Sequence, residues 1–294
     1  MTYSKRLHYL RTLLAALVSA LFFFPIYWWL TVSLKSDTEI FALPPLLFDF
    51  EVTLDSYKEV ILGITSESEA LNEGTMSWGG GNYYMLPTML DSVFIALAST
   101  FFAISISTFA AYALSRMRFK GQQHYIFWIL STRMMPPVAV AIPMFLIFKN
   151  FSLLDTYTGV IIVHTLMNLP LSILLIKSFI DDLPIEVDEV ALVDGASRWL
   201  IFRKLIFPMV RGGVAAAAVL CFIFSWTEFL FVLSLTQTSV NTIPVMSSTF
   251  VTSTGTAWGA MAALGTAATI PAFIFILLVQ KHLVRGLTMG SLKS

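Results

Sequence analysis

Four side chains that could do chemistry stand inside otherwise apolar stretches: Arg133, His164, Asn168 and Glu228. Polar and ionisable groups are costly in hydrocarbon, so each is a candidate for a functional site. His164 and Asn168 are four residues apart and share one helix face, where they either line the path of a polar solute or join two helices by a hydrogen bond. We expect Arg133 to line the same path or to be held by an ion pair or carbonyl groups, and Glu228 to lie near an outer surface, where solvation would also account for it.

A second concentration of polar residues lies at 186–208, EVDEVALVDGASRWLIFRKLIFP, between two apolar segments. The pattern predicts two helices joined by a turn. Gly195 is expected to close the first helix in the left-handed conformation, and Ser197 to cap the start of the second. The two aspartates and the proline of residues 181–184 are expected to open the first helix. So many charges between apolar segments favour contact with a soluble partner over a merely solvated surface helix.

The elements that must position these residues are membrane spans. The chain has 294 residues, of which 57% are hydrophobic and only 12% charged. About 20 apolar residues in a helix cross a hydrocarbon core of roughly 30 Å. Continuous helices satisfy the backbone in lipid, so the sequence predicts an all-α membrane protein with six transmembrane helices. They run approximately over residues 13–34, 92–115, 125–148, 157–176, 212–235 and 258–280.

Charge distribution predicts how these spans are oriented, because cytoplasmic loops carry an excess of Lys and Arg. Of the 18 basic residues, all but four fall on one side, which holds both termini and residues 186–208. The chain is therefore expected to have both ends in the cytoplasm (N-in/C-in), with the acidic stretch 36–85 outside. The first apolar run is longer than a signal-peptide core and has no small-residue cleavage site, so we expect an uncleaved span.

Within residues 186–208, the chain resembles the EAA loop of ABC importer permeases. Glu189-Val190-Ala191 is followed after three residues by Gly195, and Leu205-Ile206-Phe207-Pro208 follows after nine more. Valine, leucine and phenylalanine replace Ala, Ile and Leu of the pattern at positions 190, 205 and 207. In span three, residues 132–137 (TRMMPP) and Ile142-Pro143 resemble the corresponding segment of maltose-type sugar permeases. Residues 226–230 (WTEFL) and 285–293 (RGLTMGSLK) extend the likeness, which covers most of the chain from about residue 86 onward.

This resemblance implies a type I ABC importer permease of MetI-like fold in the cell inner (plasma) membrane. In that family the EAA loop docks on a cytoplasmic ATPase. The residues carried over to this coupling role are Glu189, Ala191, Asp194, Gly195, Ala196, Trp199, Phe202, Leu205 and Pro208. Trp199 and Phe202 are of the type enriched at interface cores. The loop after span five, with Thr242 and Pro244, is expected to contact a binding protein.

The resemblance also implies the partners: a homodimeric cytoplasmic ATPase, a second homologous permease and an extracytoplasmic binding protein that delivers a sugar, sugar alcohol or related glycoside. The sequence contains no G-x-x-x-x-G-K-[ST] phosphate loop, so ATP and Mg are expected on the partner subunits. We expect no catalytic residue, cofactor or metal on this chain. The expected division is 1–35 for the tail and first span, 36–85 for the outer loop, 86–281 for the permease core with its coupling loop 181–208, and 282–294 for the tail.

Two other function classes compete with this interpretation. An ion-coupled secondary transporter would account for Arg133 and Glu228, but it usually shows an internal repeat with broken helices, and the EAA-like loop would be unexplained. A membrane transferase with a D-G-x-x-A-R motif would use Asp194-Gly195, but the arginine, Arg198, comes one position early and no aspartate follows Asp194.

Overall fold

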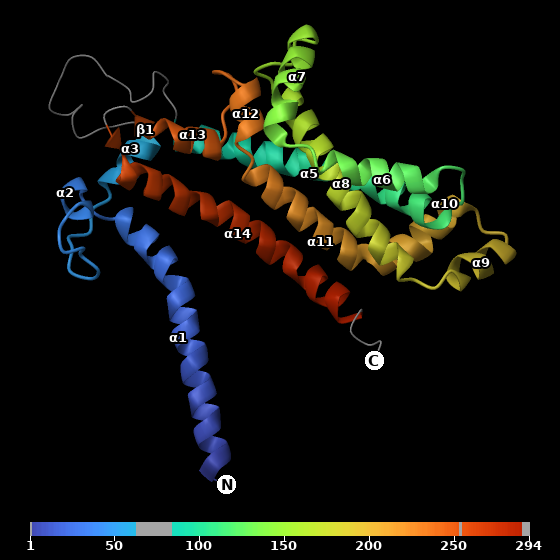
Figure 1. Cartoon of the computed structure of the whole chain (residues 1–294), viewed down its shortest axis with the longest axis horizontal. Helices are drawn as coiled ribbons and strands as arrows, with labels where there is room; N and C mark the ends of the chain where they lie inside the picture. The colour runs from blue at the N-terminus through green and yellow to red at the C-terminus, as the bar shows by residue number, and fades with distance from the viewer. Residues whose placement is uncertain (1, 63–83, 253–254, 290–294) are drawn as a thin grey trace. The chain divides into compact units, whose positions relative to one another are not determined.

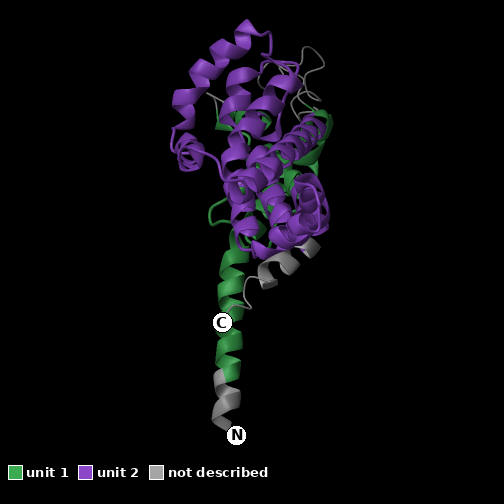
Figure 2. Cartoon of the chain, turned by 90° about the vertical axis from the view of Figure 1, so that its right-hand side faces the viewer, with its two compact units in different colours: residues 1–87, 246–269 green, residues 88–245, 270–294 purple. Residues whose placement is uncertain are grey.

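The structure is a computed structural model that describes residues 2–62, 84–252 and 255–289 (Figure 1). The Gly- and Trp-containing stretch 63–83 and residues 290–294 of the family-like tail lie outside the described residues. The chain divides into two compact units, residues 1–87 with 246–269 and residues 88–245 with 270–294 (Figure 2). Nearly all described secondary structure is helical. A two-stranded antiparallel ladder joins β1 (Val251–Thr252) to β2 (Gly255–Thr256).

The second unit is built on three long helices, α5 (Met85–Arg116), α8 (Tyr157–Asp181) and α11 (Phe207–Trp226). Their contact faces carry small side chains, which let helix backbones approach closely in a membrane. Ser99 pairs with Ser225 and Ser107 with Ser172, each by a buried hydroxyl hydrogen bond between helices. Gly213 of α11 lies against the ring of Phe179, where an added Cβ would come within 2.3 Å of ring carbons. These three helices form the frame on which the candidate sites are placed.

Five helices of the described chain are long and apolar enough to cross a membrane, and one bent pair could supply a sixth span. The six predicted spans are thus accounted for, but the third is not continuous as predicted. It consists of α6 (Gln122–Thr132) and α7 (Pro137–Asn150), which meet at 97°. Proline disfavours helical geometry in the residue before it and lacks an N–H donor, and here two prolines follow each other at 136 and 137.

The fifth span is also displaced from the predicted range 212–235. A helical stretch runs unbroken from Arg198 to Trp226, through α10 (Arg198–Ile201), the π-helical turn η1 (Phe202–Ile206) and α11. After Trp226 the helix stops, and a separate short helix, α12 (Leu230–Leu235), follows. Residues 227–235 therefore form a partly buried connection with a short helix of its own and are not the end of the span.

The first unit contains α1 (Thr2–Val32), α2 (Asp37–Ile40) and α3 (Asp55–Leu62). Large apolar side chains of α1 are exposed along the helix from Tyr9 to Ile26, as expected of a span that faces lipid or another subunit. At its outer end Lys35 is buried between the rings of Trp28 and Phe50, at 4.6 and 4.7 Å from their centroids. Helix α13 (Ile243–Thr249) bridges the sequence between the units, and α14 (Trp258–Met289) contributes residues to both.

Candidate functional site

Helix α9 (Glu186–Val193) and the turn after it lie at one end of the second unit (Figure 1). Gly195 has φ +82°, which confirms the left-handed cap predicted from the sequence. The N–H of Gly195 donates to the carbonyl of Leu192 at 3.0 Å, and the N–H of Ala196 donates to Ala191 at 2.9 Å. These two bonds make a Schellman motif, which ends the helix and fixes the direction of the following chain.

The second helix of this pair is a rigid extension of a membrane span. Ser197 caps α10, as predicted, and its Oγ accepts from the N–H of Leu200 at 3.2 Å. From there the helix continues through η1 into α11. Pro208 has no N–H to offer the carbonyl of Lys204, so the α-helical ladder is interrupted there, and the π-helical turn directly precedes this position. The backbone nevertheless stays helical from Arg198 to Trp226, so a displacement of α10 acts on the start of α11.

A buried ion pair anchors the first helix of the pair. Arg116, the last residue of α5, places its Nε 3.0 Å from Oδ2 of Asp188 in α9. Both side chains are less than one tenth exposed, at 6% and 9%. Arg116 also donates from Nη2 to the carbonyl of Leu183 at 2.9 Å. Because breaking a buried pair leaves an uncompensated charge, this contact holds α9 firmly to the end of α5.

The outward face of α9 combines apolar and acidic side chains. Val190 is 63% exposed and Val193 is 88% exposed. Glu189 and Asp194 are exposed beside them. Valines this exposed are unusual next to a well-anchored core, and together with charged neighbours they are suited to docking of another protein.

Phe202 does not belong to this outward face. It is only 6% exposed and packs against Tyr112, Phe109 and Trp199, with ring centroids 5.1 to 5.6 Å apart. Phe202 is turned toward α5 and into the core of the unit, so little of its ring is open to a partner in this chain. Trp199 stacks on Phe109 at 6.0 Å but remains 58% exposed.

The other residues of the predicted coupling set divide between core and surface. Ala191 and Ala196 are half-buried against the hydrophobic core, while Leu205 and Pro208 are exposed. The two aspartates of residues 181–184 were predicted to lie at the start of the first helix, and this prediction is wrong. Asp181 is the last residue of α8 and accepts hydrogen bonds from Lys177 and Ser115, and α9 begins only at Glu186.

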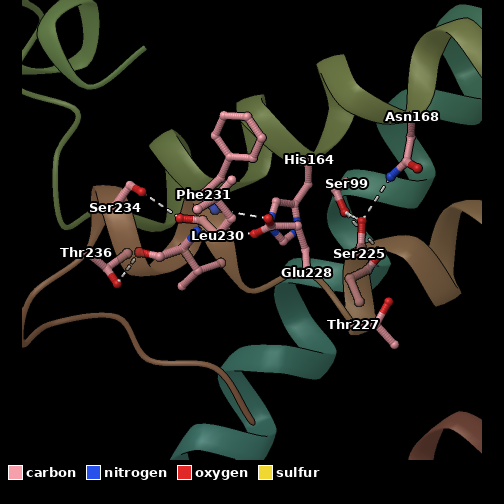
Figure 3. Close-up of polar contacts among 12 residues, drawn as sticks. Ser99, His164, Asn168, Ser225, Thr227, Glu228, Leu230, Phe231, Ser234 and Thr236 are labelled. Carbon is pink, nitrogen blue, oxygen red and sulfur yellow. Dashed lines mark hydrogen bonds and ion pairs between the residues drawn. The ribbon is translucent and has the colours of Figure 1, made fainter. Parts of the chain in front are cut away.

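A buried polar cluster lies where α5, α8 and the end of α11 meet (Figure 3). Asn168 donates from Nδ2 to Oγ of Ser225 at 3.1 Å and to the carbonyl of Cys221 at 3.3 Å. Ser225 in turn pairs with Ser99 at 2.9 Å. Asn168 is 2% exposed, and these contacts favour the interpretation that it joins helices.

Glu228 is not near a solvated surface, as the sequence suggested, but lies in the break between α11 and α12. Its side chain is 9% exposed, and Oε2 lies 3.5 Å from Nε2 of His164, which is 1% exposed (Figure 3). Its carboxylate accepts from the N–H groups of Phe231 and Val232 at the start of α12. The predicted solvation is wrong because the helix stops at Trp226 and the turn after it directs the carboxylate toward His164 and the start of α12.

Arg133 lies at the elbow between α6 and α7 and is exposed. Its guanidinium lies over the ring of Phe224, 5.2 Å from the centroid, and it makes no ion pair with any carboxylate of the described residues. It lines a cavity of about 570 Å³ between this elbow and α8, together with Trp128, Tyr125 and Thr132. Arg133 lines this cavity, whereas His164, Asn168 and Glu228 lie in the buried polar cluster, and the structure does not bring Arg133 together with those three residues.

On the side predicted to be extracytoplasmic, Asp155 organises the loop after α12. Its carboxylate accepts from the backbone N–H groups of Gln237, Thr238, Ser239 and Val240 at 3.0 to 3.3 Å. Burial by itself would raise the pKa of Asp155, but the N–H groups outweigh that effect and hold the pKa well below its ordinary value. Asp155 has φ +55°, a conformation that aspartate tolerates better than most residues.

The predicted contact residues of this loop lie outside its exposed stretch 237–239. Thr242 is 4% exposed, and Pro244 is half-buried in α13. The N–H of Ile243 donates to Ser92, and that of Asn241 to Asp91, so this part of the loop turns inward. Within residues 236–244, the exposed positions are 237–239, which Asp155 holds.

Sequence reasoning missed both Asp155 and the Arg116–Asp188 pair. Asp155 follows Leu153-Leu154 in a short polar link between two apolar runs, where a lone aspartate is an ordinary signal for a turn. Arg116 and Asp188 are 72 positions apart. Only their shared occurrence at cytoplasmic ends of spans could have suggested a pairing.

Comparison with known proteins gives a consistent result. Residues 113–289 match the family model described as binding-protein-dependent transport system inner membrane component. The chain is 32% identical over 275 residues to the trehalose transport system permease protein SugB of Mycobacterium tuberculosis, covering 92% of each chain. It is 31% identical over 281 residues to the trehalose/maltose transport system permease protein MalG of Thermococcus litoralis, covering 95% of this chain and 94% of that one.

A solved structure with the same fold belongs to a bacterial ABC transporter involved in the import of the acidic polysaccharide alginate. The TM-score is 0.70 at 19% identity, with 96% of this chain and 98% of that chain covered. The helical frame, the broken third span and the anchored helix pair thus occur in a chain whose relatives are ABC transporter permeases. The chain belongs to the family of binding-protein-dependent transport system inner membrane components.

Proposed function

We propose that this permease forms half of the pore of an ATP-driven importer. The other half is a second, homologous permease, two cytoplasmic ATPase subunits supply the energy, and an extracytoplasmic binding protein delivers the cargo. The cargo is a sugar, sugar alcohol or related glycoside. Two relatives that match over more than nine tenths of this chain carry trehalose or maltose in their names, which supports this class of cargo.

The outward face of α9 is the observation that carries the proposal. Glu189, Val190, Val193 and Asp194 form an exposed apolar and acidic patch on a helix that Arg116 fixes to α5. A patch held rigidly before binding avoids part of the ordering cost of association. It therefore suits a partner whose conformational change must be transmitted to the permease. This patch is the proposed ATPase contact.

The helix geometry suggests how such a push reaches the pore. The Schellman turn couples α9 to α10, and α10 continues into α11 without a break. Closure of the ATPase subunits on nucleotide would move this pair as a unit and shift α11 against α8, which lines the opposite side of the buried polar cluster. The permease itself performs no hydrolysis in this scheme, and ATP and Mg are bound by the partners.

The cavity at the α6–α7 elbow is the proposed solute path within this chain. Arg133, Thr132 and Tyr125 offer hydrogen-bonding groups there, and Trp128 offers an aromatic face. This combination suits the polar edges and apolar faces of a sugar ring. His164, Asn168 and Glu228 are proposed to hold α8 against α11 and α12 behind that path.

Uptake by the reconstituted complex tests the proposal. Proteoliposomes that contain the purified complex should take up solute when ATP is enclosed with the ATPase subunits and the binding protein is added. An imposed proton or sodium gradient without ATP should drive none. Uptake driven by an ion gradient alone would instead establish the secondary transporter.

Two variants separate the proposed path from the proposed contact. Arg133→Gln should lower solute uptake with ATPase copurification unchanged. Asn168→Ala should lower thermal stability and assembly yield, because one buried hydrogen-bond network is worth on the order of 1 kcal/mol. Reduced uptake with normal stability in Asn168→Ala would indicate instead that Asn168 lines the solute path.

A further inference from the structure

A second cavity lies apart from the proposed solute path, on the face where α5 meets α10, η1 and α11. It has a volume of about 480 Å³, within the range of small-molecule sites. Its lining is almost entirely apolar, with Phe101 and Phe109 on α5 and with Trp199, Phe207 and Val214 on the other wall. Phe101, Phe109, Trp199 and Phe207 are each more than 40% exposed, so these rings form an open groove and not a sealed core.

The groove has a single charge, and it lies at one end. Arg203 is the only charged residue among those that line the cavity, and it is exposed. It makes no ion pair with a carboxylate of the described part of the chain. An apolar groove that ends in a free guanidinium is complementary to a ligand with a long apolar body and an anionic head.

The dimensions of the groove fit one leaflet of the membrane. Arg203 and Ala218 both line it and are 15 positions apart on one helical stretch, about 22 Å along that helix, and Trp199, which also lines it, lies one turn beyond Arg203. Half of a bilayer with its headgroups is also about 20–22 Å thick. Because Arg203 lies on the side that carries the basic residues, the charged end is level with the inner-leaflet headgroups.

We propose that this groove binds an anionic phospholipid of the inner leaflet. One acyl chain lies between α5 and α11, the phosphate contacts Arg203, and the indole of Trp199 lies at the headgroup level, where tryptophan is enriched. This proposal depends on the expected orientation of the chain in the membrane and does not depend on which solute is transported. Since Trp199 and Phe202 also brace α10 against α5, a bound lipid would stiffen the coupling lever.

Thermal unfolding of the delipidated complex tests this site. Added phosphatidylglycerol should raise the unfolding temperature more than phosphatidylcholine of the same chain length. In Arg203→Gln the half-saturating concentration of phosphatidylglycerol should rise about fivefold, the effect of one lost basic contact. Lys204→Gln removes the neighbouring charge, which does not line the groove, and should leave that concentration unchanged.

A photo-crosslinking residue at Ser105, which lines the groove, identifies the occupant directly. Crosslinking in native membranes should yield the lipid-modified permease, at lower yield in Arg203→Gln. Capture of the second permease would overturn the proposal, because the groove would then be a subunit interface. An equal response to both lipids in the wild type, or an equal loss in Arg203→Gln and Lys204→Gln, would also overturn it.

Discussion

The two polar connections on opposite sides of the membrane differ in what they expose. The cytoplasmic pair α9–α10 presents Val190 and Val193 to solvent, while its charged Asp188 is buried on Arg116. The loop after α12 does the reverse. It hides Thr242 and Ile243 and exposes the polar residues 237–239, whose backbone is held by Asp155.

This difference matches two kinds of partner. Exposed valines on a rigid helix favour an interface with an apolar centre, which is typical of stable assembly. Exposed polar residues on a fixed backbone favour a weaker and more hydrated contact. In both regions a buried or partly buried charge fixes the backbone, so the two surfaces differ in their exposed side chains and not in how they are held.

The largest expected effect comes from breaking the anchor of α9. Arg116→Gln leaves Asp188 buried without its partner, which costs about 3–5 kcal/mol. We expect α9 to detach, with loss of ATPase copurification and of ATP-driven uptake. Arg118→Gln, two residues on and exposed, is the control and should behave as the wild type.

The double variant Arg116→Met, Asp188→Leu sharpens this test. Apolar replacement of both members of a buried pair is often neutral or stabilising, so assembly should return. If the double variant were as defective as Arg116→Gln, the charges themselves would contact the ATPase, and the patch on α9 would not be an independent docking surface.

A smaller effect is expected at the turn between the two helices. Gly195→Val should cost about 1–2 kcal/mol, because a β-branched residue is strained at φ +82°. A Cβ there would meet nothing within 4 Å, so strain alone acts. Gly195→Asn, which tolerates this conformation, is the matched control. Uptake should fall in Gly195→Val with membrane insertion unchanged, and normal uptake with wild-type ATPase copurification would remove the turn from the coupling path.

Both helix ends of this turn could be predicted from the sequence because they depend on local chemistry. Gly195 and Ser197 act within four residues of their own position, through one backbone conformation and one side-chain bond. The number and approximate places of the spans were also accessible, since length and apolar composition decide them, but the break in the third and the bounds of the fifth were not. The EAA-like motif singled out residues 186–208 for the same reason: it is contiguous in the chain.

The polar clusters could not be predicted, since they depend on where the helices break. The burial of Glu228 follows from the stop after Trp226, and that of Phe202 from the rotation of α10 toward α5. Neither the stop of the helix nor the orientation of α10 is marked by a distinct residue pattern within these apolar segments. Asp155 and the N–H groups it binds are more than 80 positions apart, and only the packing of α7, α8 and α12 brings them together.

The smallest expected effect is at the extracytoplasmic loop. Asp155→Asn removes the charge from the hydrogen bonds to residues 237–240 and should cost about 1–2 kcal/mol, reduced by partial exposure. Amide hydrogen exchange of these four N–H groups should become about tenfold faster, which corresponds to 1.4 kcal/mol. Exchange in α9 should not change. Asp182→Asn, exposed on the other side of the membrane, is the control.

Amide protection in the same loop should decrease only when the pH is lowered. Because the folded-state pKa of Asp155 is lowered from an ordinary value of about 3.9, its contribution to stability is complete above that value and is lost as pH falls toward the folded-state pKa. Protection of residues 237–240 in the wild type should therefore be constant from about pH 7 to 5 and decline only below about pH 4. Asp155→Asn should show no such decline. A wild-type loss of protection between pH 7 and 5 would show that another group holds the loop, and its polar tip would then no longer be comparable with the anchored face of α9.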